Sequence, residues 1–312
     1  MDVLTNKRRI FLTKLEKRYK KFERFTKYSG YDFFKKIKRL LLTPNIYIPY
    51  VFYRLPLFKN NSFITTLFWG KKIKFKINDS SSALLHSSGL LLGEVCLTKF
   101  FIKNLKDNDV FYDIGANYGF YTYLSLEFCA EVHCFEPLPS VFKELKNNLL
   151  KVNNVFLNNV VVSNMSGQTD LHLSVSSDVS TINKKILKIT PYKYTDKIKV
   201  KAITLDEYIA NYSKPTVIKI DVEGAENMVI EGGTQFLKNN SPIIVMEVWP
   251  GENGKNISME PVEELRNLGF QSYYLDFRGE LQKVQGDLSR LPRFNGDNFI
   301  FLKEKMFYKS II

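Results

Sequence analysis

The sequence predicts an α/β protein with a doubly wound, seven-stranded sheet and a basic N-terminal extension. Between residues 110 and 303, apolar runs of strand length alternate with helical segments, which is typical of a parallel sheet covered by helices. A glycine-containing turn follows the first run, and an acidic residue stands at the end of each of four runs. Because ligands bind at the carboxyl ends of parallel strands, these observations predict a ligand site at one edge of the sheet.

The positive charge is concentrated at the start of the chain. The net charge is +13 over 312 residues. Residues 1–76 contain 20 Lys and Arg against 4 Asp and Glu, a net charge of +16, so that residues 77–312 carry −3. We expect this extension to cover residues 1–70 and a single catalytic domain to cover residues 71–312.

The extension has the pattern of amphipathic helices. From residue 6 to residue 28, apolar side chains recur at steps of three and four among lysines and arginines, and residues 31–42 repeat the pattern. Residues 7–42 therefore either bind an anionic membrane surface or pack their apolar side on the catalytic domain or on a second subunit. Nucleic acid is a less favoured partner, and the sequence leaves the oligomeric state open. The apolar positions of the first helix are Phe11, Leu15, Tyr19, Phe22 and Phe25.

Cysteine usage and the N-terminus indicate the compartment. Cys96, Cys129 and Cys134 are odd in number and lack metal-ligand spacing, so we expect neither a disulfide framework nor a zinc site. The N-terminus lacks the apolar core of a signal peptide, and no run of about 18 uncharged apolar residues occurs. We expect a protein of the cytoplasm, either free or peripheral on the cytosolic face of a membrane.

Three segments precede the predicted sheet. Residues 46–58 are apolar and aromatic, but their prolines and arginine exclude a regular membrane-spanning helix. Residues 71–77 alternate lysine with apolar side chains and predict an edge strand. Residues 84–106 predict a helix in their second half.

The first strand of the sheet leads into the glycine turn. Val110–Ile114 predicts a buried strand, Gly115 and Gly119 a turn, and Phe120 the start of a helix. Glycines let a backbone pass close to a ligand, and a helix N-terminus offers unpaired N–H groups. The turn therefore predicts a site for a polar, partly anionic molecule, which its inner residues contact. These residues are Ala116, Asn117 and Tyr118.

The second strand indicates which cofactor binds. It ends in Glu136, followed by Pro137, and a carboxylate there can accept hydrogen bonds from both hydroxyls of a ribose. Two nucleoside cofactors fit, NAD and S-adenosylmethionine. An NAD site favours G-x-G-x-x-G, whereas this turn has Asp113, Gly115, Asn117 and Gly119 at alternate positions. This looser, acidic turn favours S-adenosylmethionine. An NAD-dependent oxidoreductase and a non-enzymatic membrane-peripheral protein on the same fold remain the alternatives.

The remaining segments complete the sheet. Residues 140–151 predict a helix, and residues 154–162 predict the third strand. Residues 163–202 are too long for a simple connection and predict a hairpin-like insertion whose loop overhangs the site. Thr204 and Glu207 form a capping-box pattern at the start of a short helix. The last four predicted strands are residues 215–220, 241–248, 272–277 and 298–303, with helices at 225–232 and 261–268 and a basic loop at 278–296.

Four motifs in this order resemble those of the FkbM-type methyltransferases. They are residues 111–122, 135–137, 217–226 and 244–248, and the resemblance spans roughly residues 85–304. It implies a Rossmann-like, class I fold and methyl transfer from S-adenosylmethionine to a hydroxyl oxygen of a small molecule or glycan, most plausibly a sugar of a glycan or glycolipid. It also implies that Asn159 and Val160 lie near the adenine, with Pro137 beside the cofactor.

Carboxylates at the strand ends are the candidates for chemistry. Asp113, Glu136, Asp221 and Glu247 should meet at one edge, and they should face ligands because unpaired buried carboxylates are costly. Asp113 either provides polarity around the methionine moiety or caps the N–H groups of its own turn. Methyl transfer requires an aligned acceptor and a group that takes its proton.

Asp221 is the first candidate for this base, Glu247 the second, and Glu223 lies next to Asp221 in sequence. Clustered carboxylates would alternatively hold Mg²⁺, which we favour less. In a purely structural interpretation, Glu223 starts the following helix and Asp221 fixes the turn. His86, His133 and His172 are isolated or lie in an apolar strand, which indicates structural roles.

Overall fold

A computed structural model describes most of the chain, in two compact units. The described residues are 3–27, 33–53, 55, 61–77, 80–174, 180–189, 194–248, 259–284, 288 and 294–303. The units are Met1–Lys103 and Asn104–Ile312. Parts of four predicted segments lie outside the described residues. They are 1–2, 28–32, 54 and 56–60 of the basic extension, of which 54 and 56–58 also belong to the apolar segment, 175–179 and 190–193 of the insertion, and 285–287 and 289–293 of the basic loop.

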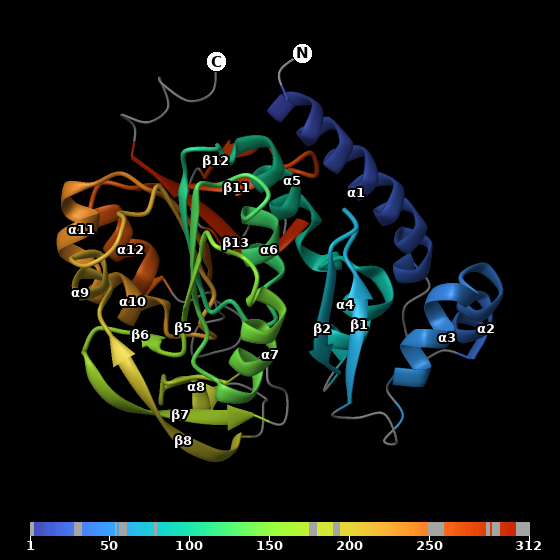
Figure 1. Ribbon diagram of the computed structural model, residues 1–312, viewed down its shortest axis with the longest axis horizontal. Coiled ribbons are helices and arrows are strands. Elements are labelled where there is room, and N and C mark those ends of the chain that lie inside the picture. Colours follow the sequence, from blue (N-terminus) through green and yellow to red (C-terminus); the bar gives the residue numbers. More distant parts are fainter. Residues whose placement is uncertain are drawn as a thin grey trace. The chain divides into compact units, whose positions relative to one another are not determined.

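The first unit contains five α-helices, one short 3-10 helix (Leu92–Glu94) and a two-stranded hairpin among its described residues (Figure 1). Its boundary lies 33 residues beyond the end that we expected for the extension, because the hairpin bonds to the helices. Thr65 donates to the His86 carbonyl at 3.2 Å, and the Phe68 amide donates to the Gly89 carbonyl at 3.1 Å. The elements are α1 (Val3–Lys27), α2 (Phe33–Leu42), α3 (Pro44–Tyr53), β1 (Ser62–Thr66), β2 (Lys72–Lys76), α4 (Ser80–Ser88) and α5 (Val95–Asn104).

The predicted amphipathic helix near the N-terminus is α1, and its apolar side is buried within the first unit. Leu15 is 0% exposed, and the Phe11 ring stacks on Trp69 with 6.0 Å between ring centroids. Arg18 donates to the Ser88 carbonyl at 2.6 Å. Helix α1 therefore packs its apolar side inside the first unit, whereas the packing interpretation named the catalytic domain or a second subunit as its partner. Among the described residues, no single helix combines the length and apolar composition needed to cross a membrane. The helical segments 82–88 and 92–104 meet both criteria only when they are taken together, and the chain bends by 75° between them.

The second unit is built on a mixed sheet of eight strands. Five neighbouring strands run parallel, in the order β10-β9-β3-β4-β5, and the other three pair antiparallel at one edge, in the order β12-β11-β13 beside β10. The doubly wound prediction is therefore confirmed, with one strand more than expected. The strands are β3 (Val110–Ile114), β4 (Glu131–Phe135), β5 (Val155–Asn158), β9 (Val217–Ile220), β10 (Ile243–Glu247), β11 (Gln271–Leu275), β12 (Leu281–Lys283) and β13 (Phe294–Leu302).

Helices cover both faces of this sheet (Figure 1). Helices α9 to α12 lie on one face, and α6 and α7 lie on the other. The core consists mainly of aliphatic and aromatic side chains between the layers, among them Tyr112, Ile218 and Ile244, each 0% exposed. The helices are α6 (Phe120–Ser125), α7 (Pro139–Leu149), α9 (Leu205–Ile209), α10 (Glu226–Gly232), α11 (Thr234–Asn239) and α12 (Glu260–Asn267).

The predicted third strand, residues 154–162, is wrong as a single strand. It divides into β5, in the main sheet, and β6 (Val161–Val162), which pairs parallel with β8 (Tyr194–Ile203) in a separate three-stranded sheet. There, β7 (Gly167–Ser174) pairs antiparallel with β8 and confirms the hairpin-like insertion. The short helix α8 (Ile186–Ile189) lies in the same insertion.

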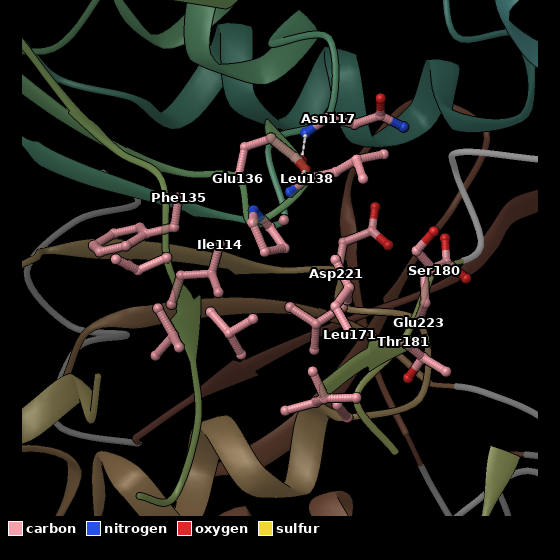
Figure 2. A pocket seen from close by; sticks show the side chains of 18 residues that line it. Ile114, Asn117, Phe135, Glu136, Leu138, Leu171, Ser180, Thr181, Asp221 and Glu223 are labelled. Carbon is pink, nitrogen blue, oxygen red and sulfur yellow. Dashed lines mark hydrogen bonds between the residues drawn. The ribbon is translucent and has the colours of Figure 1, made fainter. Parts of the chain in front are cut away.

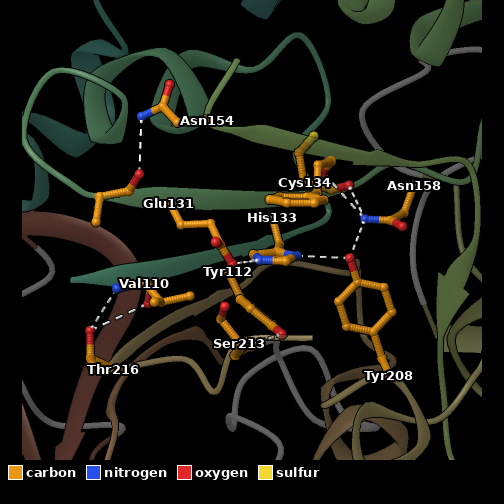
Figure 3. Close-up of polar contacts among 12 residues, drawn as sticks. Val110, Tyr112, Glu131, His133, Cys134, Asn154, Asn158, Tyr208, Ser213 and Thr216 are labelled. Carbon is orange, nitrogen blue, oxygen red and sulfur yellow. Dashed lines mark hydrogen bonds and ion pairs between the residues drawn. The ribbon is translucent and has the colours of Figure 1, made fainter. Parts of the chain in front are cut away.

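A buried polar cluster connects β4 and β5 to α9. The His133 ring lies between Glu131 and Tyr208, with Nε2 2.5 Å from a Glu131 carboxylate oxygen and Nδ1 2.8 Å from the Tyr208 hydroxyl (Figure 3). Asn158 donates to the same hydroxyl at 3.0 Å. These contacts give His133 a structural role.

The predicted capping box at the start of α9 is half formed. Thr204 accepts from the Glu207 amide at 3.1 Å.

Candidate active site

A pocket lies where the winding of the sheet reverses. Strands β3 and β9 are neighbours, and the chain proceeds from β3 to β4 and β5 on one side but from β9 to β10 on the other. The pocket is lined by residues from the ends of both strands, including Ile114, Gly115 and Asp221. This reversal point is where open α/β sheets bind their ligands.

The two glycines of the first turn are required by packing inside the protein. Both have left-handed backbones, with φ of +84° at Gly115 and +82° at Gly119. A Cβ at residue 115 would lie 1.8 Å from the Asp221 carbonyl oxygen, and one at residue 119 would lie 2.4 Å from the Leu145 side chain. Gly115 therefore lets the end of β3 approach the end of β9. Only Gly115 of this pair lines the pocket among the described residues.

Glu136 lies in the pocket wall and organises the loops around it. It is 7% exposed, and its two carboxylate oxygens accept from the Asn117 amide at 2.9 Å and the Leu138 amide at 2.8 Å (Figure 2). Burial raises the pKa of Glu136 to about 7, although the two amides act in the opposite direction. Asn159 donates to the carbonyls of Glu136 and Pro137 at 2.8 and 3.0 Å, which holds this loop from behind.

Asp113 lies in the protein interior, outside the residues that line the pocket. It is 1% exposed and accepts from the Thr122 hydroxyl at 2.6 Å. Burial raises the pKa of Asp113, while nearby Lys219 and the Thr122 hydrogen bond favour the charged form. Its Oδ1 has no hydrogen-bond partner among the described residues. Asp113 therefore supports the turn from the side of α6.

The three carboxylates that we predicted as catalytic candidates lie close together. Ligand atoms of Asp221, Glu223 and Glu247 all lie within 4.8 Å of one another. Asp221 follows β9, and Glu247 ends the neighbouring parallel strand β10, so the sheet register brings them to one edge. Lys219 is 3% exposed, and its ammonium lies 2.7 Å from Asp221 Oδ2 and 5.1 Å from the centre of the Tyr121 ring. The cluster therefore contains a buried cation as well as three acids.

The turn from Asp221 to Gly224 is held in an unusual conformation. Glu223 has a φ of +57°, which non-glycine residues rarely adopt. One Glu226 carboxylate oxygen accepts from the amides of Val222 and Gly224 at 3.2 and 3.1 Å. Burial raises the pKa of Glu226 to about 7. Glu226, rather than Glu223, thus starts helix α10, and Glu223 is left at the pocket wall.

The insertion forms the opposite wall of the pocket. Leu171, Ser180, Thr181 and Ile182 line it. Asn183 is 8% exposed and donates to the Gly224 carbonyl at 2.5 Å, which ties the insertion to the carboxylate turn. The prediction that the insertion overhangs the site thus agrees with the structure for residues 180–182.

A comparison with known families identifies the domain that contains this pocket. The model of the methyltransferase FkbM domain matches residues 113–272, just over half of the chain. The chain belongs to the FkbM methyltransferase family. The match begins at Asp113 and includes the glycine turn, Glu136, the insertion and the carboxylate cluster.

Two characterised proteins are similar to this FkbM-family chain. The hexuronic acid methyltransferase AglP of Haloferax volcanii is 28% identical over 172 residues, which cover 54% of this chain and 67% of AglP. The 2-O-methyltransferase NoeI of Sinorhizobium fredii is 27% identical over 146 residues, which cover 42% of this chain and 60% of NoeI. Among solved structures, an FkbM methyltransferase from Methylobacillus flagellatus aligns with a TM-score of 0.41 and 12% identity, over 72% of this chain and 55% of that one.

The predicted site residues of this FkbM-family protein fall into two groups. Those in the pocket wall are Gly115, Asn117, Glu136, Pro137, Val160, Asp221 and Glu223. Those outside the described wall are Asp113, Ala116, Tyr118, Gly119 and Asn159, and Glu247 joins the site through the carboxylate cluster. Sequence reasoning missed Lys219, Asn183 and the role of Glu226. A lysine inside an apolar strand was the one available signal for Lys219, because such a charge needs a buried partner.

Proposed function

We propose that this protein transfers a methyl group from S-adenosylmethionine to a hydroxyl oxygen of a sugar, in a glycan or glycolipid. The observation that carries the proposal is the pocket between β3 and β9, which has Glu136 on one side and the cluster of Asp221, Glu223 and Glu247 on the other. Family membership supplies the reaction class. The sugar acceptor is supported by the two relatives, one named for hexuronic acid and one for 2-O-methylation.

The pocket residues fit an adenosyl compound that also carries charged groups. Two of its polar atoms, Asn117 Oδ1 and Ser180 Oγ, are buried without a hydrogen-bond partner in the described part of the chain (Figure 2). Buried polar atoms normally have partners, so a bound ligand accounts for these two. Glu136 has lone pairs left for ribose hydroxyls, and Val160 and Leu138 offer apolar contacts to a base. Bound here, the cofactor supplies an electrophilic methyl group.

The carboxylate cluster would orient the acceptor and receive its proton. Asp221 is held by a buried cation, because its Oδ2 lies 2.7 Å from the Lys219 ammonium. That ion pair holds the side chain in one position at the pocket wall. An acceptor hydroxyl placed against Asp221 can donate its proton there as the oxygen attacks the methyl carbon.

A divalent metal is the alternative use of the same cluster. Three carboxylates within 4.8 Å are a plausible ligand set for Mg²⁺. Lys219, however, already occupies the position beside Asp221 with a positive charge. We therefore propose that transfer does not require a metal. Full activity after treatment with EDTA is the expected result, and restoration by Mg²⁺ after its loss would establish the metal instead.

Two measurements test the proposed function. Isothermal titration with S-adenosylhomocysteine and, separately, with NADH should give heat only with the first. Binding of NADH alone would replace our proposal with an oxidoreductase. Mass spectrometry of surface glycans from the host with and without the gene should show a loss of one methyl group per modified sugar, and unchanged glycans would remove the glycan acceptor.

A further inference from the structure

Helix α2 presents its apolar side outward, unlike an ordinary surface helix. Viewed along the axis at 100° per residue, five of its six apolar side chains occupy one continuous arc of about 120°, and Leu42 lies outside this arc. All five are exposed, by 37% to 72%, and no residue of α2 is buried. A helix of a water-soluble domain normally buries such a stripe. The five residues, called here the α2 face, are Phe33, Phe34, Ile37, Leu40 and Leu41.

The polar side of α2 is the side that contacts the rest of the first unit. Arg39 donates to the Phe25 carbonyl of α1 at 3.0 Å, and its guanidinium lies 4.2 Å from the centre of the Phe25 ring. Phe25 itself is 2% exposed. Helix α1 buries its apolar stripe in the same unit. Outward exposure of an apolar stripe therefore distinguishes α2 from α1.

The next helix also exposes apolar side chains. In α3, Ile46 is buried, whereas Ile48 and Val51 are 54% and 40% exposed. Helices α2 and α3 lie side by side (Figure 1). Large exposed apolar patches on soluble proteins mark interaction sites.

The charges beside this surface indicate what covers it. Helix α2 carries Lys35, Lys36, Lys38 and Arg39 and no acidic residue. On the helical wheel, Lys36 and Lys38 flank the α2 face, one on each edge, whereas Lys35 and Arg39 lie on the opposite side of the helix. If two copies joined through the α2 face, the two flanking lysines would meet like charges, whereas an anionic surface would neutralise them. A basic helix with an aromatic and aliphatic face is suited to the interface of a lipid bilayer.

We propose that α2 docks this protein on the surface of an anionic bilayer. The α2 face enters the boundary between headgroups and acyl chains, and the flanking lysines contact the lipid phosphates. The helix lies in the plane of the interface, because its 10 residues are too few to span the hydrocarbon. Among the described residues, this surface is separate from the pocket between β3 and β9.

Vesicle sedimentation of the full-length chain tests this proposal. We expect binding to vesicles of phosphatidylglycerol and phosphatidylcholine and much weaker binding to phosphatidylcholine alone. The double variant Phe33→Ser/Leu41→Ser should lose about tenfold or more in vesicle affinity, since it removes two inserted side chains. The matched control is Leu150→Ser/Met165→Ser, which removes two side chains of the second unit that are 68% and 71% exposed. It should bind like the wild type.

A second pair of variants tests the charges. Lys36→Gln/Lys38→Gln should reduce binding to anionic vesicles, and Lys146→Gln/Lys151→Gln, exposed lysines of the second unit, should not. Unchanged titration with S-adenosylhomocysteine would show that each variant is folded. Equal binding of the wild type and the Phe33→Ser/Leu41→Ser variant would overturn the proposal. A second pair of results would also overturn it. These are no vesicle binding by the wild type and a wild-type dimer in light scattering that dissociates in the Phe33→Ser/Leu41→Ser variant.

Discussion

At the scale of single residues, we expect Glu136 to link the pH of the solution to cofactor binding. Its pKa is about 7 in the folded protein, because the carboxyl group is buried. Ribose hydroxyls donate to the ionised carboxylate, so binding should favour that form and lower the pKa. The affinity for S-adenosylhomocysteine should therefore be constant well above pH 7 and fall as the pH drops through 7, by up to about tenfold per unit.

Titration calorimetry at pH 8, 7 and 6 checks this prediction. The Glu136→Gln variant, which cannot ionise, should bind more weakly at pH 8 and show a flatter pH profile. A wild-type affinity that does not change from pH 8 to pH 6 would show that Glu136 does not contact the ligand. His133 should not contribute to this profile, because it lies in the separate cluster with Glu131 and Tyr208.

Lys219 is the second residue with a measurable role. It is buried, and its replacement by methionine would leave the carboxylates of Asp221 and nearby Asp113 without their cation. We expect Lys219→Met to lower the free energy of unfolding by about 3 kcal/mol and the rate of methyl transfer by at least about tenfold.

Urea denaturation and initial rates measure these two effects. The control is Lys197→Met, which removes a lysine that is paired with Asp170 on the surface at 2.9 Å. It should change neither quantity appreciably, because exposed ion pairs contribute little. A Lys219→Met enzyme with the wild-type rate would show that the cation serves folding alone.

At the scale of elements, a hydrogen bond couples the insertion to the carboxylate turn. Asn183 donates to the Gly224 carbonyl, and residues 180–182 line the pocket beside it. Asn183→Ala should release this wall and weaken binding of S-adenosylhomocysteine by up to about tenfold, the effect of one buried hydrogen bond.

The control for this prediction is Asn164→Ala. Asn164 donates to Glu231 at 2.6 Å at an exposed position of the same insertion. This variant should bind the ligand with unchanged affinity in calorimetry. If both variants bind like the wild type, the insertion does not shape the cofactor site.

The strands also show which parts of the fold could be predicted from the sequence. Regular alternation of apolar runs and helices predicted seven strands of the main sheet, because buried parallel strands are short and continuously apolar. The eighth strand, β12, is only three residues long and contains Gln282 and Lys283, so it has no such pattern. The break between β5 and β6 was also missed: Asn158 and Asn159 interrupt the apolar run there, but the pairing of Val161 and Val162 with β8, which separates the two strands, is not visible in the residue pattern.

The site was predictable to the extent that topology determines it. Asp221 and Glu247 meet because the ends of parallel neighbouring strands meet, and this follows from the order of the motifs. The contribution of Lys219 depends on which carboxylate its side chain reaches, and that of Glu226 on a tight turn that brings it back onto two amides. Such contacts depend on local geometry that residue types alone do not specify.

At the scale of the whole molecule, the basic extension shows the limit of pattern reasoning. Helices α1 and α2 have the same amphipathic chemistry, yet α1 buries its apolar stripe and α2 exposes it. The difference lies in what each helix packs against, which charge and periodicity do not encode. The first unit also ends at Lys103 rather than near residue 70, because hydrogen bonds join its hairpin to helices that the composition assigned to the catalytic domain.

The central claim is that Asp221, at the pocket between β3 and β9, receives the proton of an acceptor hydroxyl during methyl transfer. The most direct measurement is the rate of methyl transfer from S-adenosylmethionine to a hexuronic acid acceptor by the wild type and by Asp221→Asn. We predict transfer by the wild type and a loss of at least about 100-fold in the variant, with its affinity for S-adenosylhomocysteine largely retained. Transfer by Asp221→Asn at the wild-type rate would contradict the account.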